Sequence, residues 1–140
     1  MTQEFILHEK LAADCAVVTD WPLSRILLMK DAAYPWLILV PRLPGLRDLD
    51  ELTSPDFQEV SREIRSVSKV MKEMFQPTKM NVAALGNMVP QLHIHVIARF
   101  EDDAAWPAPV WGVQPPVAYE ETALEARLSS LRRTLDGLAV

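Results

Sequence analysis

One stretch constrains the fold of this chain more than any other, an amphipathic segment over residues 54–76. Its apolar side chains recur at steps of three and four, the period of a helix with one buried face: Phe57, Val60, Ile64, Val67, Met71 and Met74. Ser54 can cap this helix, Pro55 suits its first position, and Pro77 ends it. Charged residues, Glu63 among them, fill the remaining positions. The pattern predicts a long helix that divides the chain into two groups of strands.

Short apolar runs lie on both sides of this helix. Three precede it and two follow it, each bounded by turn residues: 16–19, 25–29, 36–40, 79–85 and 91–98. The run WLILV at 36–40 is apolar at every position, which predicts a strand that is buried on both faces. Consecutive strands with short turns favour antiparallel pairing, so we predict an α+β fold.

The two ends of the chain add further elements. Residues 3–13 are predicted to form a short helix that buries Phe5, Leu7, Leu11 and Ala12. The Pro- and Trp-rich segment 101–119 predicts an irregular arm that buries four side chains: Trp106, Val110, Trp111 and Val113. A second amphipathic helix follows, with Leu124, Leu128, Leu131, Leu135 and Leu138 on one face and Gly137 near its end. We expect one domain over 1–140, with a core at about 5–99 and an extension at 100–140.

Composition excludes several classes of protein. The net charge of −5 and the pI of about 5.1 argue against broad binding to nucleic acid or to an anionic membrane. No apolar run approaches the ~18 residues of a membrane span, and the first residues do not resemble a secretory signal. Cys15 is the only cysteine, so no intrachain disulfide can form. We therefore expect a cytoplasmic protein.

Two of the three histidines stand one residue apart in the run 91–98. Alternation in a strand points Gln91, His93 and His95 to one face, which we expect to be exposed. The other face packs on the core with Leu92, Ile94, Val96 and Ala98. Residues two apart lie roughly 6.5–7 Å apart along a strand, so both imidazoles can converge on one small group.

This run and its surroundings resemble the histidine triad (HIT) family of nucleotide hydrolases and transferases. The family signature is His-φ-His-φ-His-φ-φ, where φ is apolar, and here Gln91 replaces the first histidine. A strand with Asn81 and the turn Gly86-Asn87 precede it, as in the family. Further upstream, Asp31 ends one strand, and the next strand ends in Pro41-Arg42.

The resemblance implies a HIT-like fold: a five-stranded antiparallel sheet, a long helix between strands 3 and 4, and a C-terminal helix. It also implies a homodimer whose sheets join and whose long helices pack together. The implied substrate is a purine nucleotide, with no cofactor and no nucleic acid or membrane partner. The chain departs from the family pattern at Gln91, at Met88, where many members have Ser or Thr, and after Arg42, where a further histidine is absent.

The resemblance assigns roles residue by residue. His93 would attack the α-phosphorus and form a covalent nucleotidyl-histidine, with the backbone carbonyl of Gln91 accepting a hydrogen bond from its other nitrogen. His95 would contact the phosphate oxygens, and Asn81 and Asn87 would add polar contacts. The remaining nucleotide-binding residues would be Asp31 on the ribose, Leu7, His8, Leu11 and Met29 around the base, and Gln91.

Two other readings of the same residues stay open. His93 and His95 could hold Zn²⁺ together with a carboxylate such as Asp31, and His8 is the only other imidazole in the chain. Alternatively, the departures from the triad fit a module that binds nucleotides or another protein without catalysis.

Overall fold

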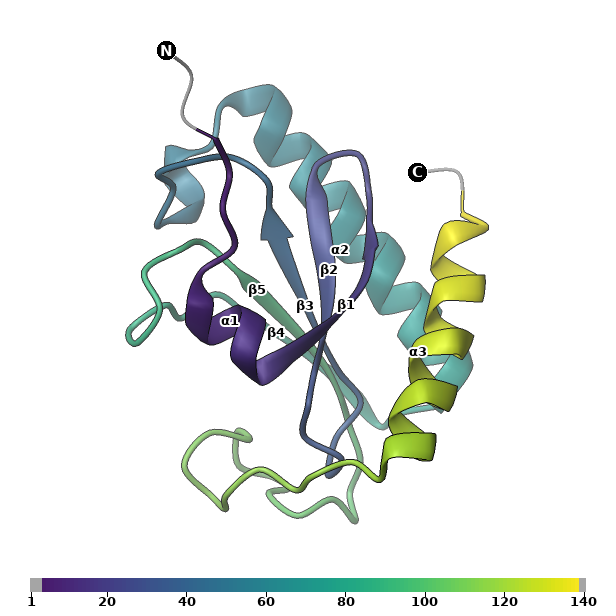
Figure 1. Ribbon diagram of the computed structural model, residues 1–140. Helices are drawn as coiled ribbons and strands as arrows, with labels where there is room; N and C mark the ends of the chain where they lie inside the picture. The colour runs from purple at the N-terminus through teal and green to yellow at the C-terminus, as the bar shows by residue number, and fades with distance from the viewer. Residues whose placement is uncertain (1–3, 139–140) are drawn as a thin grey trace.

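An antiparallel sheet forms the centre of the molecule in the computed structural model, which describes residues 4–138 (Figure 1). Its five strands are β1 (Cys15–Asp20), β2 (Ser24–Met29), β3 (Trp36–Pro41), β4 (Lys79–Ala83) and β5 (Ile94–Arg99). They lie in the order β1-β2-β3-β5-β4, and all four neighbouring pairs are antiparallel. The predicted α+β class and the antiparallel sheet are confirmed.

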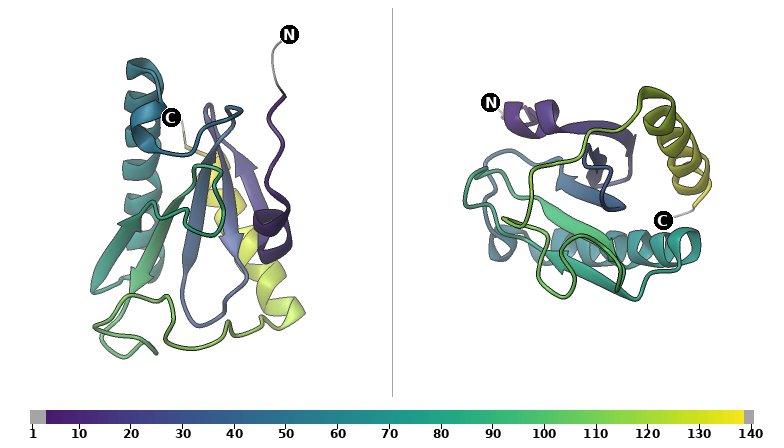
Figure 2. Two further views of the ribbon diagram at one scale, coloured as in Figure 1. Left: turned by 90° about the vertical axis from the view of Figure 1, so that its left-hand side faces the viewer. Right: turned by 90° about the horizontal axis from the view of Figure 1, so that it is seen from below.

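Helices and loops cover the two faces of the sheet differently (Figure 2). The long helix α2 (Ser54–Phe75) and the C-terminal helix α3 (Glu121–Asp136) cover one face. The short helix α1 (Glu9–Asp14) and the arm that follows β5 contribute to a second apolar cluster on the other face. A single turn of 3₁₀ helix, η1 (Leu49–Glu51), precedes α2. No helix within residues 4–138 is long and apolar enough to cross a membrane.

Helix α2 follows the predicted period, with corrections at its first turn and at Glu63. Val60, Val67 and Met71 are buried as expected. Phe57, however, is 45% exposed and lies in the first turn of α2. The cap is Thr53 rather than Ser54, since the Thr53 side chain accepts a hydrogen bond from the backbone N–H of Asp56.

The sequence prediction that Glu63 lies on the polar face of α2 is wrong. Its side chain is fully buried, and its Oε2 accepts hydrogen bonds from the backbone amides of Leu23 at 3.0 Å and Ser24 at 3.4 Å. The carboxylate therefore satisfies two amides at the start of β2, where α2 packs against the β1–β2 turn.

The prediction for the central strand β3 is confirmed, whereas several predictions for the two ends of the chain are wrong. All six residues of β3 are buried, as the unbroken apolar run predicted. The N-terminal helix begins only at Glu9, so residues 4–8 are extended, and Ala12 is exposed. In the arm Val110 is buried, but Trp111 and Val113 are exposed, contrary to prediction. Leu138 lies beyond the end of α3 and is also exposed, because Gly137 already caps the helix.

Arg99 at the end of β5 holds the start of the arm in place. Its buried guanidinium pairs with Asp103, with Nε 2.8 Å from Oδ2, and donates to the backbone oxygen of Ala108 at 2.8 Å. The Asp103 carboxylate in turn accepts from the backbone amides of Phe100 and Trp106. An extended, proline-rich segment is thus fixed by one buried ion pair and its hydrogen bonds.

Candidate functional site

His93 and His95 lie together on the face of the sheet that carries α1 and the arm. Strand β5 begins at Ile94, so His93 directly precedes it and His95 is its second residue. The two ring centroids are 4.9 Å apart. The exposed fractions are only 6% and 5%, so the expectation of an exposed histidine face is wrong. The N-terminal segment and the arm, which are remote in sequence, cover this face.

The Nδ1 atom of His93 lies 2.7 Å from the backbone carbonyl oxygen of Gln91. A carbonyl oxygen can only accept, so the Nδ1 atom carries the proton and Nε2 keeps its lone pair. Burial lowers the pKa of His93, although the Gln91 carbonyl opposes this effect. The ring is therefore neutral at physiological pH, which is the form in which imidazole is a nucleophile.

His95 is oriented by a residue that the sequence did not single out. Its Nδ1 accepts a hydrogen bond of 3.0 Å from the indole Nε1–H of Trp36, the first residue of β3. Burial, and then the neighbouring His93, lower the pKa of His95 to about 4. The Trp111 ring, from the arm, lies 5.0 Å from the His95 ring and 5.9 Å from the Trp36 ring.

The side chain of Gln91 ties the N-terminal segment to the histidine strand. Its Oε1 accepts from the backbone N–H of His8 at 2.8 Å, and its Nε2 donates to the carbonyl of Ile6 at 2.9 Å. A primary amide carries its acceptor and its donor side by side, so it can bridge residues 6 and 8 as a paired strand would. Both ends of the Gln91 side chain are thus engaged within the protein.

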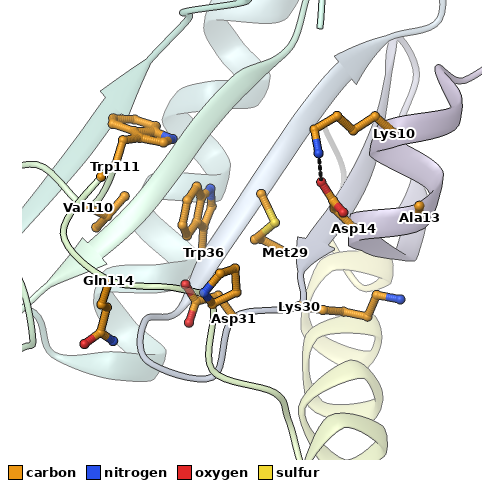
Figure 3. A pocket seen from close by; sticks show the side chains of 12 residues that line it. Lys10, Ala13, Asp14, Met29, Lys30, Asp31, Trp36, Val110, Trp111 and Gln114 are labelled. Carbon is orange, nitrogen blue, oxygen red and sulfur yellow. Dashed lines mark ion pairs between the residues drawn. The ribbon is translucent and has the colours of Figure 1, made fainter. Parts of the chain in front are cut away.

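A pocket of about 520 Å³ opens beside Trp36, the hydrogen-bond partner of His95 (Figure 3). Its wall brings together aromatic, charged and flexible apolar side chains from α1, β2, β3 and the arm, including Lys10, Met29, Asp31, Trp36, Trp111 and Gln114. Two of these, Met29 and Asp31, are predicted site residues. Lys10 forms an ion pair with Asp14 at the rim, with Nζ 3.1 Å from Oδ2.

Asp31 is buried at the floor of this pocket. Its Oδ1 accepts from the backbone amides of Ala33 at 3.0 Å and Val117 at 3.1 Å. These bonds fix the carboxylate and tie the loop after β2 to the end of the arm. In the described part of the chain Oδ2 makes no hydrogen bond, so this oxygen is the one left for a ligand.

The predicted base-binding residues cluster near one another. Leu11 is buried in the apolar cluster that also contains Trp36, and Leu7 and Met29 pack against that cluster. His8 caps α1, and its Nδ1 accepts from the backbone N–H of Lys10 at 3.0 Å. The structure therefore brings these four residues to the same side of the sheet as the two histidines.

His93 itself lines a second, smaller pocket of about 310 Å³. The loop after β3 and the turn after β4 form this pocket, and they supply Arg47, Asp48, Asp50 and Gly86. Gly86 has φ +74°, a left-handed conformation that glycine adopts without strain. Asn87 is exposed in the same turn and faces a neighbouring hollow together with Arg47.

Asn81 does not lie next to His93. In the sheet register it pairs with Ile97, while Ala83 pairs with His95. Its Oδ1 accepts from Nη1 of Arg99 at 2.8 Å. The amide nitrogen of Asn81 makes no hydrogen bond with the described residues, so the predicted polar contact to a ligand would use this group.

The grouping of metal-ligating side chains bears on the alternative of a zinc site. Within residues 4–138, no three side chains of His, Cys, Asp or Glu are grouped so that they could hold a metal ion. The Nδ1 atoms of both strand histidines are engaged by Gln91 and Trp36, as described above.

Comparisons with known proteins place these observations in context. The family model described as HIT domain matches residues 10–102. A histidine triad protein from Marinobacter aquaeolei VT8 is 48% identical, with 98% of this chain and 100% of that chain covered and a TM-score of 0.94. A histidine triad protein from Bradyrhizobium japonicum is 46% identical, with 94% and 98% covered and a TM-score of 0.91.

A third solved structure, a histidine triad (HIT) protein from Sinorhizobium meliloti 1021, is 36% identical, with 96% of this chain and 97% of that chain covered and a TM-score of 0.90. No curated protein matches the chain. The three structural matches extend over nearly the full length of this chain, so the similarity includes the arm and α3 as well as the sheet.

Proposed function

This chain belongs to the HIT domain family, and from that premise we propose that it is a nucleotide hydrolase or nucleotidyl transferase. It acts at the α-phosphate of a purine nucleoside phosphoramidate or of a dinucleoside polyphosphate. The observation that carries this proposal is the state of His93. Its ring is neutral, its Nδ1 proton is held by the Gln91 carbonyl, and it stands beside His95 and lines the smaller pocket.

The proposed reaction has two displacement steps. In the first, the lone pair on Nε2 of His93 forms a bond to the α-phosphorus, and the bond from phosphorus to the leaving oxygen or nitrogen breaks. The leaving group departs with the bonding electrons and takes up a proton from solvent. In the second step, water attacks the phosphorus and gives up a proton to solvent, the P–N bond breaks with its electron pair returning to Nε2 of His93, and the mononucleotide is released. Another acceptor in place of water gives the product of nucleotidyl transfer. The Gln91 carbonyl stabilises the His93 ring while it carries positive charge.

The larger pocket is the proposed nucleoside site. The free oxygen of Asp31 accepts from the ribose hydroxyls, and the base lies against Met29, which packs with Leu7 and Leu11 in one apolar cluster. His8, beside that cluster, would help to enclose the base. Trp36 and Trp111 provide aromatic faces on the side of the histidines. Asn87 and the amide nitrogen of Asn81 contribute polar contacts to the phosphate or to the leaving group.

We also propose a homodimer in which β4 pairs with its copy. β4 is an edge strand of the sheet, and an open edge with apolar side chains is a template for pairing with a second chain. Val82, Leu85 and Met88 are exposed along this edge and its following turn, and Phe57 is exposed on α2. Light scattering after size exclusion tests this proposal: a mass of twice 15.8 kDa supports it, and a monomer contradicts it.

The function is tested by incubating purified protein with adenosine and guanosine phosphoramidates and with dinucleoside polyphosphates. Release of AMP or GMP that persists after treatment with EDTA supports the proposal. His93→Ala, with its fold verified by circular dichroism, should abolish the release. If the wild-type protein is stabilised by AMP but turns over none of these compounds, it is a binding module instead. Activity that is lost with EDTA and restored by Zn²⁺ would indicate the metal enzyme.

A further inference from the structure

We propose that Trp36 is a positioning residue for His95: its indole N–H fixes the proton of the neutral His95 ring on Nε2. His95 then serves as a hydrogen-bond donor beside the His93 nucleophile. The catalytic part of this inference rests on the function proposed above, whereas the position of the proton can be measured in the free protein. The supporting observation is the 3.0 Å distance from Trp36 Nε1 to His95 Nδ1 between two buried side chains.

The direction of this hydrogen bond is unambiguous. An indole N–H is a donor only and has no acceptor capacity on nitrogen, so Nδ1 of His95 must be the atom with the lone pair. The single proton of a neutral ring is then on Nε2. A protonated His95 would place an N–H group against the N–H group of Trp36, so this contact favours the neutral ring.

The two strand histidines therefore hold opposite tautomers. His93 carries its proton on Nδ1, because that atom faces the carbonyl of Gln91, and presents a lone pair at Nε2. His95 presents an N–H at Nε2. A nucleophilic atom and a donor thus stand on one face of the sheet with ring centroids 4.9 Å apart.

This pairing matches the charge changes of the proposed reaction. The non-bridging oxygens of the α-phosphate gain charge density as His93 attacks, and a fixed N–H that points at them stabilises the transition state. In the other tautomer, His95 would direct a lone pair at the same oxygens and repel them. Trp36 therefore determines whether His95 assists or opposes the reaction.

Packing holds the Trp36 indole in place. Trp36 stands opposite Ile97 in the register of β3 and β5. Its ring lies edge-on to Tyr34 at 6.3 Å and to Trp111 at 5.9 Å, and it also forms part of the pocket wall (Figure 3). Because the Gln91 side chain bonds to residues 6 and 8, the group that orients His95 comes from β3 and not from the first triad position.

The test is ¹⁵N NMR of the imidazole nitrogens at pH 7 without substrate, in the wild type and in two matched variants. Trp36→Phe keeps an aromatic ring and removes the N–H. Trp111→Phe makes the same change in the neighbouring ring, whose indole nitrogen donates no hydrogen bond to a described residue. We expect a protonated Nε2 and an unprotonated Nδ1 on His95 in the wild type and in Trp111→Phe, and a mixture of tautomers in Trp36→Phe.

The kcat of Trp36→Phe should fall about 10-fold, the equivalent of one hydrogen bond.

A wild-type spectrum with the proton of His95 on Nδ1 overturns the inference, and this result does not require any variant to fold. An unchanged tautomer in folded Trp36→Phe overturns it as well. If the wild type turns over no nucleotide, the proposed function fails while the spectrum still decides the role of Trp36, so the two failures can be told apart.

Discussion

The link between Gln91 and the N-terminal segment yields a sharp prediction. Gln91→Ala removes the hydrogen bonds to the amide of His8 and to the carbonyl of Ile6. At about 1 kcal/mol for each bond, local opening of this segment becomes easier by about 2 kcal/mol. Because every 1.4 kcal/mol is a factor of ten, the His8 amide should exchange with solvent about 30-fold faster.

Hydrogen exchange followed by NMR measures this rate directly. Gln58→Ala is the matched control, since Gln58 is exposed on α2 and makes no hydrogen bond through its side chain with the described residues. Amides in the middle of β3 should exchange equally in both variants. For nucleotide binding, we expect Gln91→Ala to raise KM, because Leu7 and His8 are proposed to enclose the base. The kcat should change little, since the backbone carbonyl that holds His93 remains.

One result would refute this reasoning. If the His8 amide exchanges at the same rate in Gln91→Ala and in the wild type, the amide bridge does not stabilise the segment. The side chain at the first triad position would then be free for a ligand, as the sequence alone suggested.

Two further predictions concern buried carboxylates. Burial raises the pKa of Glu63 above its ordinary value of 4.5, although the backbone amides of Leu23 and Ser24 oppose this effect. As the pH rises above about 4.5, the side chain ionises first in the unfolded chain, so the free energy of unfolding falls. Glu63→Gln should therefore raise Tm at pH 8, and the gain should shrink toward pH 4. Equal gains at both pH values would contradict this. Burial alone would raise the pKa of Asp103, but the hydrogen bonds from Arg99 and from the backbone of Phe100 and Trp106 hold this pKa at about 2. The contribution of Asp103 to the free energy of unfolding is therefore present at neutral pH and is lost as the pH falls from about 4 to about 2. Asp103→Asn should lower the free energy of unfolding, measured in urea at pH 7, by about 3 kcal/mol. The control Asp102→Asn, at an exposed residue, should leave it nearly unchanged. Similar losses in both variants would contradict a stabilising role for the buried ion pair.

The sequence allowed the fold to be predicted because each element has a strong local signal. The period of α2 and the unbroken apolar run of β3 depend only on neighbouring residues. Errors arose where tertiary contacts decide the outcome. The local pattern predicts Glu63 on the surface of the helix, but its carboxylate is buried because it accepts hydrogen bonds from the backbone amides of Leu23 and Ser24 at the start of β2. Residues 4–8 are extended because Gln91, far along the chain, binds their backbone.

In the candidate site, too, local patterns predicted some features, and tertiary contacts decided the others. The shared face of His93 and His95 follows from alternation within one strand. Trp36 could not be assigned from the sequence, since its contact with His95 depends on the pairing register of β3 and β5. The coverage of the histidines by the arm depends on the buried pair of Arg99 and Asp103, which spacing alone does not predict.

The central claim is that His93 is the nucleophile, and trapping the covalent intermediate tests it most directly. Wild-type protein is mixed with a purine nucleoside phosphoramidate, quenched within one turnover and digested, and its peptides are analysed by mass spectrometry under conditions that preserve phosphorus–nitrogen bonds. The account predicts a nucleotidyl group on His93 that is absent from His93→Ala. Turnover with no adduct, or an adduct on His95 alone, would contradict it.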